Sequence, residues 1–317
     1  MWAYLFRRLV YNIPVYLGVI LLVMLALRVN DPVYANLGKN ATEQQIEARR
    51  ESMGLKKPFV VQYAIFVKQV ATLDFNSYSW RHPGTTVGEL MGRAVGPSLA
   101  LTVPALILTS LISICVSIVA AFFRGRPIDR TLVVLAVLGM SISFLVYIIL
   151  GQYFGAHMLN KELEKEIFAI HGYKPGIMEW PKYCLLPVMI SVIVAMGYDT
   201  RFYRAVMVEE TNRDYIITAK AKGATRRKIM FVHMLKNAMI PIVTRISITL
   251  PFLIVGSILL EVFFGIPGMG QALISAVNQQ DFPVVQAFTS VFAGLYILTN
   301  LFTDVLYALL DPRVRLS

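Results

Sequence analysis

Long apolar stretches alternate with polar ones along the whole chain. A helix needs roughly 20 apolar residues to cross the ~30 Å hydrocarbon core of a bilayer, so each long apolar stretch predicts a membrane span. Six spans are expected, over residues 9–27, 97–123, 131–150, 183–204, 241–262 and 284–306. Between them lie three expected outer segments, 28–96, 151–182 and 263–283, and a polar loop, 205–240. The pattern predicts an all-α integral membrane protein in which residues 1–317 form a single transmembrane domain.

Lys and Arg are distributed as this arrangement requires. The chain has 30 Lys and Arg against 19 Asp and Glu, a formal net charge of +11. Arg124, Arg126 and Arg130 crowd the turn after the second span, whereas 263–283 contains no Lys or Arg. Because short cytoplasmic loops are enriched in these residues, this turn, loop 205–240 and both termini are expected in the cytoplasm. The charge comes with no nucleic-acid motif, which argues against a nucleic-acid partner.

Composition leads independently to the same class. Hydrophobic residues make up 56% of the chain and charged residues 15%, and the mean hydropathy is +0.62. This is far more apolar than a soluble domain needs, so we expect membrane lipid around the chain. Cys115 and Cys184 fall within or beside apolar spans and do not build a disulfide framework.

Loop 205–240 is expected to contain two short helices joined by a hinge. Thr211 and Asp214 have the spacing of a capping box, which predicts a helix that begins near Asp214 and ends at Gly223, a residue suited to a left-handed C-cap. Thr225 can cap the second helix, along which apolar residues recur at helical spacing and basic residues take the other faces. Charge alone leaves open a solvated linker attracted to lipid headgroups.

The order of motifs in this loop resembles a known family. Ala219, Gly223, Leu235 and Pro241 look like the loop of ABC importer permeases that docks on the ATPase. The fuller pattern is similar to the first, B-type permease of the oligopeptide, dipeptide and nickel subfamily: Asp214-Tyr215, Thr218 to Gly223, His233, Leu235 to Ala238, then Pro241. An outer-loop pattern typical of this subfamily follows, comprising Gly265, Pro267, Gly268, Gly270, Asp281 and Pro283.

The resemblance implies a fold, partners and a site. The fold would be a type I ABC importer permease bundle of six helices with a cytoplasmic coupling helix, placed in the bacterial cytoplasmic (inner) membrane. Partners would be a second homologous permease, two ATP-binding subunits and an extracytoplasmic substrate-binding protein. The docking residues would be Asp214, Tyr215, Thr218, Ala219, Lys220, Ala221, Lys222 and Gly223. The implied cargo is a di- or oligopeptide, with nickel or a metal chelate as the alternative.

No motif for chemistry on this chain accompanies these features. A Gly-rich run ending in Gly-Lys-Ser or Gly-Lys-Thr is missing from the sequence, so ATP and magnesium are expected on partner subunits, with no cofactor bound here. No metal site is expected either, because the spacing of the four histidines fits none: His82, His157, His171 and His233. The chain is therefore interpreted as a non-catalytic transport subunit, with a stand-alone secondary transporter and an intramembrane enzyme as the competing hypotheses.

Some polar residues of the fifth span raise a further possibility. Thr244, Ser247, Ser257 and Glu261 can line a translocation path, although small polar residues also simply pack helices. In the second outer segment, the charges between Lys161 and Glu166 predict a short charged helix.

Overall fold

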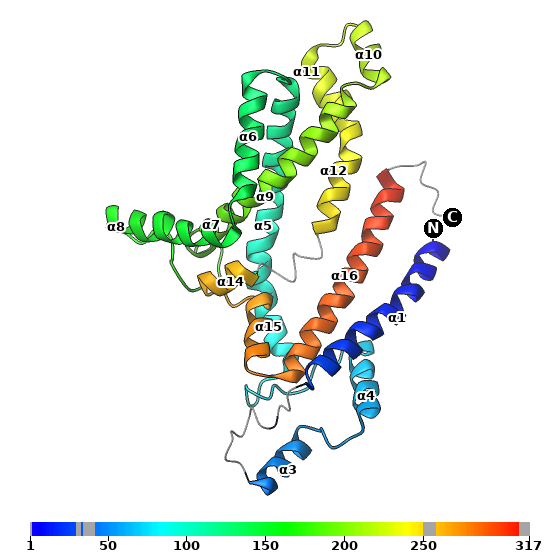
Figure 1. The fold of residues 1–317 in the computed structure, drawn as a ribbon, viewed down its shortest axis with the longest axis vertical. Coiled ribbons are helices and arrows are strands. Elements are labelled where there is room, and N and C mark those ends of the chain that lie inside the picture. Colours follow the sequence, from blue (N-terminus) through cyan, green and yellow to red (C-terminus); the bar gives the residue numbers. More distant parts are fainter. Residues whose placement is uncertain (1, 30–32, 34–41, 250–257, 311–317) are drawn as a thin grey trace. The chain divides into compact units, whose positions relative to one another are not determined.

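The computed structural model describes residues 2–29, 33, 42–249 and 258–310, and within them the regular structure is helical apart from one isolated bridge between Tyr78 and Thr86 (Figure 1). The chain divides into two compact units. The first takes in Met1–Ser98 and Pro267–Phe302, and the second takes in Leu99–Ile266 and Thr303–Arg315, apart from the residues left undescribed. Two of the boundaries fall inside helices, α5 (Val87–Phe122) and α16 (Phe282–Leu310), and the third falls between Ile266 and Pro267, outside any helix.

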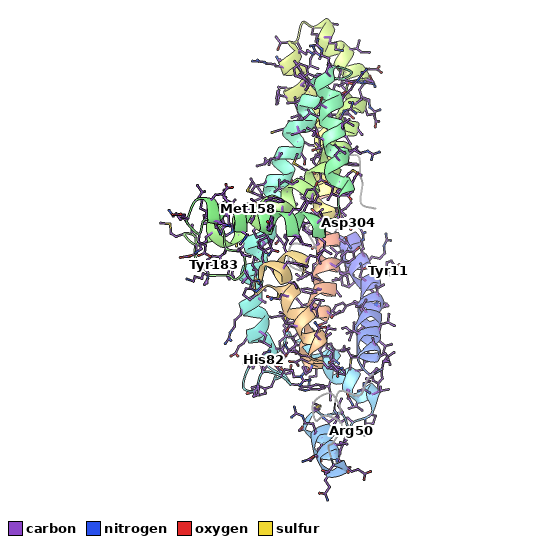
Figure 2. All side chains as sticks on the ribbon, turned by 60° about the vertical axis from the view of Figure 1, so that its left-hand side comes forward. Tyr11, Arg50, His82, Met158, Tyr183 and Asp304 are labelled. Atoms are coloured by element: carbon purple, nitrogen blue, oxygen red, sulfur yellow. The ribbon has the colours of Figure 1, made fainter. Side chains whose placement is uncertain are left out.

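Five helical stretches of the described chain are long and apolar enough to cross a bilayer: Phe6–Ala26, Val87–Phe122, Trp180–Glu210, Arg226–Thr249 and Phe282–Leu306. The first lies in α1 (Trp2–Ala26), where large apolar side chains are left exposed. Tyr11, for example, is 69% exposed and points away from the ribbon (Figure 2). Such apolar surface needs lipid around it, so this is a multi-pass membrane protein.

The third expected span, 131–150, is not one continuous helix. α6 (Pro127–Ser141) stops, and the helical run from Phe144 to Glu162 leaves it at an angle of 91°. Ile142 between them has an extended backbone (φ −89°, ψ 136°), and the Ser141 hydroxyl donates to the carbonyl oxygen of Val137 at 2.7 Å. A serine bonded to its own helix in this way slightly weakens the helix and often bends it.

Beyond the bend, α7 (Phe144–Leu150), the π-helical segment η1 (Gly151–Met158) and α8 (Leu159–Glu162) follow without interruption. This arm packs closely on α9 (Trp180–Glu210). A Cβ atom at Gly151 would lie 2.5 Å from Ile190 Cδ1, and one at Gly155 would lie 2.9 Å from Leu186 Cδ1. Two glycines four residues apart thus form a groove for two branched side chains four residues apart, a packing typical of membrane helices.

The charged helix expected between Lys161 and Glu166 is cut short. α8 ends at Glu162, and Glu164 has a left-handed backbone with φ 47°. The Asn160 side-chain oxygen accepts the backbone N–H of Ile167 at 2.8 Å, so this amide turns the chain back toward its own helix. A side chain that bonds the backbone a few residues on competes with helix formation, which explains why the charge pattern alone misled.

The first unit contains α1, two short helices and an outer loop. α3 (Glu43–Ser52) begins with a capping box built by Thr42 and Gln45. α4 (Phe59–Ala71) packs against α1 through Phe66 and Val70. A cavity of about 540 Å³ in this unit is lined by residues that include Arg28, Arg49, Lys57, Trp80 and Pro283.

Candidate functional site

The candidate site is the loop between α9 and α12 (Leu235–Thr249), residues 211–234. It holds α10 (Asp214–Ala221), the short α11 (Arg226–Lys228) and the π-helical segment η2 (Ile229–Met234). Gly223 adopts φ +74°, in the left-handed region that glycine occupies at helix ends. Thr225 accepts the N–H of Lys228 at 3.4 Å. A short first helix, a glycine turn and a threonine cap are thus confirmed. The second expected short helix is wrong, because the helix that begins at Arg226 continues without a break through η2 and α12 to Thr249.

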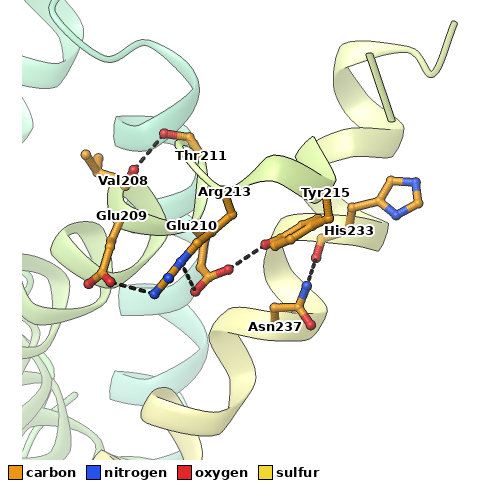
Figure 3. Close-up of polar contacts among 8 residues, drawn as sticks. All are labelled: Val208, Glu209, Glu210, Thr211, Arg213, Tyr215, His233 and Asn237. Carbon is orange, nitrogen blue, oxygen red and sulfur yellow. Dashed lines mark hydrogen bonds and ion pairs between the residues drawn. The ribbon is translucent and has the colours of Figure 1, made fainter. Parts of the chain in front are cut away.

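The capping box expected from Thr211 and Asp214 is wrong. The N-cap of α10 is Arg213, which makes no side-chain cap bond, and Asp214 is the first helical residue. The Thr211 hydroxyl donates to the carbonyl oxygen of Val208 at 2.6 Å, at the end of α9 (Figure 3). Asp214 still places its negative charge in the first turn, where the helix dipole favours it.

A small polar network ties the start of α10 to the end of α9 (Figure 3). Arg213 Nη2 lies 2.8 Å from Glu209 Oε1, and Arg213 Nε lies 3.8 Å from Glu210 Oε1. The Tyr215 hydroxyl donates to Glu210 Oε2 at 2.5 Å. Desolvation by burial, followed by the bond to the Glu210 carboxylate, raises the pKa of Tyr215 to about 12. The phenol therefore stays protonated at neutral pH and keeps its hydrogen for Glu210.

The expected docking residues do not share one face of α10. Ile216 and Ala219 are buried in a cluster with Tyr203, Met207 and residues of η2 and α12. Asp214, Thr218, Lys220, Ala221, Lys222 and Gly223 are exposed, and Tyr215 is half-buried. Ala219 therefore fixes α10 to its own chain instead of offering a free surface.

Ile217 is a candidate that the sequence reading missed. It is 60% exposed although it is a large apolar side chain, and helical spacing places it beside Ala221 on the exposed face. The signal was present in the Ile216-Ile217 pair, because neighbouring residues on a helix cannot both face the core. α10 thus presents an apolar centre on a helix whose opposite face is anchored.

The residues proposed for pore lining are not gathered on an open surface. The Thr244 hydroxyl donates to the carbonyl oxygen of Ile240 at 2.8 Å, within α12. Ser247 is 2% exposed, and Glu261, on α14 (Ile258–Phe264), is 0% exposed. Ser257 lies outside the described residues. Arg245, on the same helix as Thr244, pairs with Asp199 of α9 at 3.1 Å.

Gly265, of the outer-loop pattern, lies in the second unit and is required by close packing. Its φ is +63°, and a Cβ atom there would lie 2.2 Å from His171 Nε2. The neighbouring N–H of Gly172 donates to the carbonyl oxygen of Phe264 at 2.7 Å. Because position 265 has no side chain, the loop that contains His171 and Gly172 can lie against the end of α14.

The rest of that pattern lies in the first unit. Gly268 is the N-cap of α15 (Met269–Asn278), directly after Pro267, and Gly270 is buried. Asp281 is 2% exposed and accepts the N–H of Trp80 at 3.0 Å and that of Arg81 at 3.4 Å, as well as the Ser79 hydroxyl. Asp281 thus organises the loop around residue 80.

No group of three His, Cys, Asp or Glu side chains that could hold a metal ion occurs in the part of the chain that the structure describes.

Comparisons with known proteins identify one family. Residues 113–316 match the family described as binding-protein-dependent transport system inner membrane component. Residues 1–82 match the N-terminal family of such membrane components.

Full-length relatives agree with these matches. The chain is 32% identical to a probable peptide ABC transporter permease protein of Sinorhizobium fredii, over 99% of this chain and 100% of the relative. It is 31% identical to a putative peptide permease protein of Brucella suis, over 100% of both. It is 34% identical to a glutathione transport system permease protein of Salmonella typhimurium, over 99% of both.

Proposed function

The chain belongs to the family of binding-protein-dependent transport system inner membrane components, and from this premise we propose that it carries peptides inward across the bacterial inner membrane. It is a permease subunit of an ABC importer. The names of its relatives, two for peptides and one for glutathione, itself a small peptide, support a peptide cargo. These names give the nickel or metal-chelate alternative no support.

The coupling step of this proposal takes place at α10. Its exposed face, centred on Ile217 and Ala221, would enter a cleft of an ATP-binding subunit. Its buried face, with Ile216 and Ala219, packs on side chains of α9 and α12, and Tyr215 bonds to the end of α9. When the ATPases close on nucleotide, the displacement of α10 is therefore passed to two spanning helices. A rigid-body movement of this kind can switch a permease between outward and inward openings.

The observation that carries this proposal is the two-sided character of α10. Ile217 is an apolar side chain that is 60% exposed, whereas Ala219, two residues on, is buried at 8% exposure. An exposed apolar centre rimmed by polar residues is typical of a protein interface. ATP and magnesium would be bound by two such ATPase subunits, with a second permease and a substrate-binding protein completing the importer. The termini would lie in the cytoplasm.

The test compares variants of the complete importer in proteoliposomes. Ile217→Glu should release the ATPase subunits during purification and abolish ATP-dependent uptake of a labelled dipeptide mixture, because a charge would be buried in the interface. Ile217→Leu, which keeps an apolar side chain at the same place, is the matched control and should retain both. ATPases that stay bound and active in transport with Ile217→Glu would overturn the docking proposal. Uptake by the purified chain alone, driven by an ion gradient, would favour a secondary transporter.

A further inference from the structure

The turn between α5 and α6, residues 123–126, lies against the loop that holds α10. Two polar contacts of the second unit connect the turn region with the segments before and after α10. Arg124 Nη1 donates to Asn212 Oδ1 at 3.4 Å, just before α10. Arg226 Nη2, just after α10, donates to the carbonyl oxygen of Phe122 at 2.7 Å, and its guanidinium lies 4.3 Å from the Phe122 ring centroid. The end of α5 and the turn are thus hydrogen-bonded to the segments on both sides of α10.

A stronger contact lies immediately beside this turn. Asp129, in the first turn of α6, is 3% exposed. Its Oδ1 accepts Arg204 Nε at 2.6 Å and its Oδ2 accepts Arg204 Nη2 at 2.7 Å. The backbone N–H of Gly125 also donates to Oδ2, at 2.9 Å. This two-pronged geometry fixes both the distance and the orientation of the two groups.

The ion pair is one of several places where α9 is held to α6. At Gly197 a Cβ atom would lie 2.8 Å from the carbonyl oxygen of Ala136, and the Tyr198 hydroxyl donates to the carbonyl oxygen of Met140 at 3.4 Å. Arg204 lies two helical turns after Gly197 in α9, close to the end of α9 that leads into α10. Packing keeps the middle of α9 against α6, and the ion pair holds the two helices together at the end of α9 that lies nearest α10.

Stability alone gives a poor account of such a pair. Buried ion pairs are often no more stabilising than apolar residues of the same volume, and their best-attested role is to fix the register of neighbouring elements. Arg204 and Asp129 come from helices that meet beside the proposed coupling element. Register is therefore the property that this pair supplies.

We propose that Asp129 and Arg204 form a coupling latch, a pair of positioning residues that carries the displacement of α10 into α6 and α5. The proposal rests on the function proposed above. When α10 is pushed, the end of α9 moves first, and the latch makes α6 follow. α5 moves with them, because Arg124 of the turn bonds Asn212 and Arg226 bonds Phe122 at the end of α5. Without the latch, ATP is still hydrolysed by the docked ATPases but less of the movement reaches the permease core.

Two variants separate the latch from folding. Arg204→Lys keeps the charge but loses the two-pronged fork. The double variant Asp129→Leu with Arg204→Met replaces both charges by apolar side chains, so that no buried charge is left unpaired. Glu166→Gln serves as the matched control, because it breaks another 2.6 Å ion pair of the same unit, which Glu166 makes with Lys182 near the start of α9.

The experiment measures ATP hydrolysis and uptake of a labelled dipeptide mixture by the reconstituted importer, together with retention of the ATPases. We expect both latch variants to keep the ATPases and hydrolyse ATP, while uptake per ATP falls about tenfold, within the range of coupling energies along connected networks. Glu166→Gln should leave this ratio unchanged. A ratio within about twofold of wild type in both assembled latch variants would overturn the latch, at the lower end of the same range. Failure of the proposed function is distinguishable, since the wild-type complex itself would then show no ATP-dependent uptake, and the latch would fall with it.

Discussion

Gly197 offers a direct measure of how closely α9 and α6 are packed. Replacing it by alanine would place a methyl group 2.8 Å from the carbonyl oxygen of Ala136 and 3.2 Å from the backbone nitrogen of Met140. Both atoms belong to the backbone of α6, so they cannot rotate away as a flexible side chain would. The two helices must separate locally, and overpacking of this kind costs about 2 kcal/mol.

A matched variant isolates this steric cost. Alanine at a helical glycine also stabilises the helix itself by about 1 kcal/mol, which partly offsets the strain. Gly92, in α5, has no atom within 4 Å of a Cβ placed there, so Gly92→Ala receives the helix-propensity gain alone. The difference between the two variants is therefore the clash at Gly197, about 2 kcal/mol.

The assay follows thermal unfolding in detergent through Cys184. This thiol is buried and becomes reactive toward a fluorogenic reagent when the packing around it opens, and a Cys115→Ser background removes the signal of the exposed thiol. At about 2–4 °C per kcal/mol for a unit of this size, Gly197→Ala should melt roughly 4–8 °C below Gly92→Ala. Equal midpoints, or a higher one for Gly197→Ala, would refute the close contact between the two helices.

Other predictions concern single contacts. Gly223→Ala should lower the stability of the fold by about 1–2 kcal/mol, because a residue with a Cβ atom is strained at φ +74°, whereas Gly223→Asn should lower it less. Amide hydrogen exchange in α10 should become faster in the alanine variant alone. Thr225→Ala should lose about 1 kcal/mol of cap stability, seen as faster exchange of the Lys228 amide. Tyr215→Phe should cost about 1 kcal/mol at pH 7. Since the fold raises the pKa of Tyr215 to about 12, this contribution is complete below the ordinary pKa of about 10 and is lost as the pH rises through 12, which titration of tyrosinate absorbance checks. Asp281→Asn should loosen the loop around residue 80, because the NH₂ group that replaces one carboxylate oxygen cannot accept a hydrogen bond. Trypsin cleavage after Arg81 should then be severalfold faster, and unchanged cleavage would contradict the role of Asp281.

The sequence predicted those features that depend on local chemistry. The long apolar runs marked the spanning helices, and Gly223 and Thr225 marked the turn and cap because glycine tolerates a left-handed backbone and threonine accepts a backbone N–H. The bend at Ile142 could not be predicted, because Ser141 and Ser143 stand inside a long apolar stretch where small polar residues also occur in straight membrane helices, and hydropathy does not indicate the direction of a helix. Thr211 has two possible backbone partners within reach, and spacing cannot decide between them.

Within the candidate site, the segment was predicted but not the orientation of its side chains. Ala219 was assigned to the docking surface and is buried, whereas Ile217, two residues before it, was left out and is exposed. Which face of a short helix is free depends on where the neighbouring helices lie, and α9 and α12 are brought there by tertiary packing. The Asp129–Arg204 pair joins residues 75 positions apart, a pairing that no local pattern indicates.

The bend after α6 makes this protein sensitive to the thickness of its membrane. α6 has 15 residues, a rise of about 22 Å, whereas the hydrocarbon core measures about 30 Å. The arm that follows carries exposed Ile149, Tyr153 and Phe154, so it can lie within the apolar layer, or the bilayer beside it can thin. Both responses are forms of hydrophobic mismatch, whose cost grows with each ångström of excess thickness. The acyl-chain length of the surrounding lipids is therefore a variable that sets how easily the bundle changes shape.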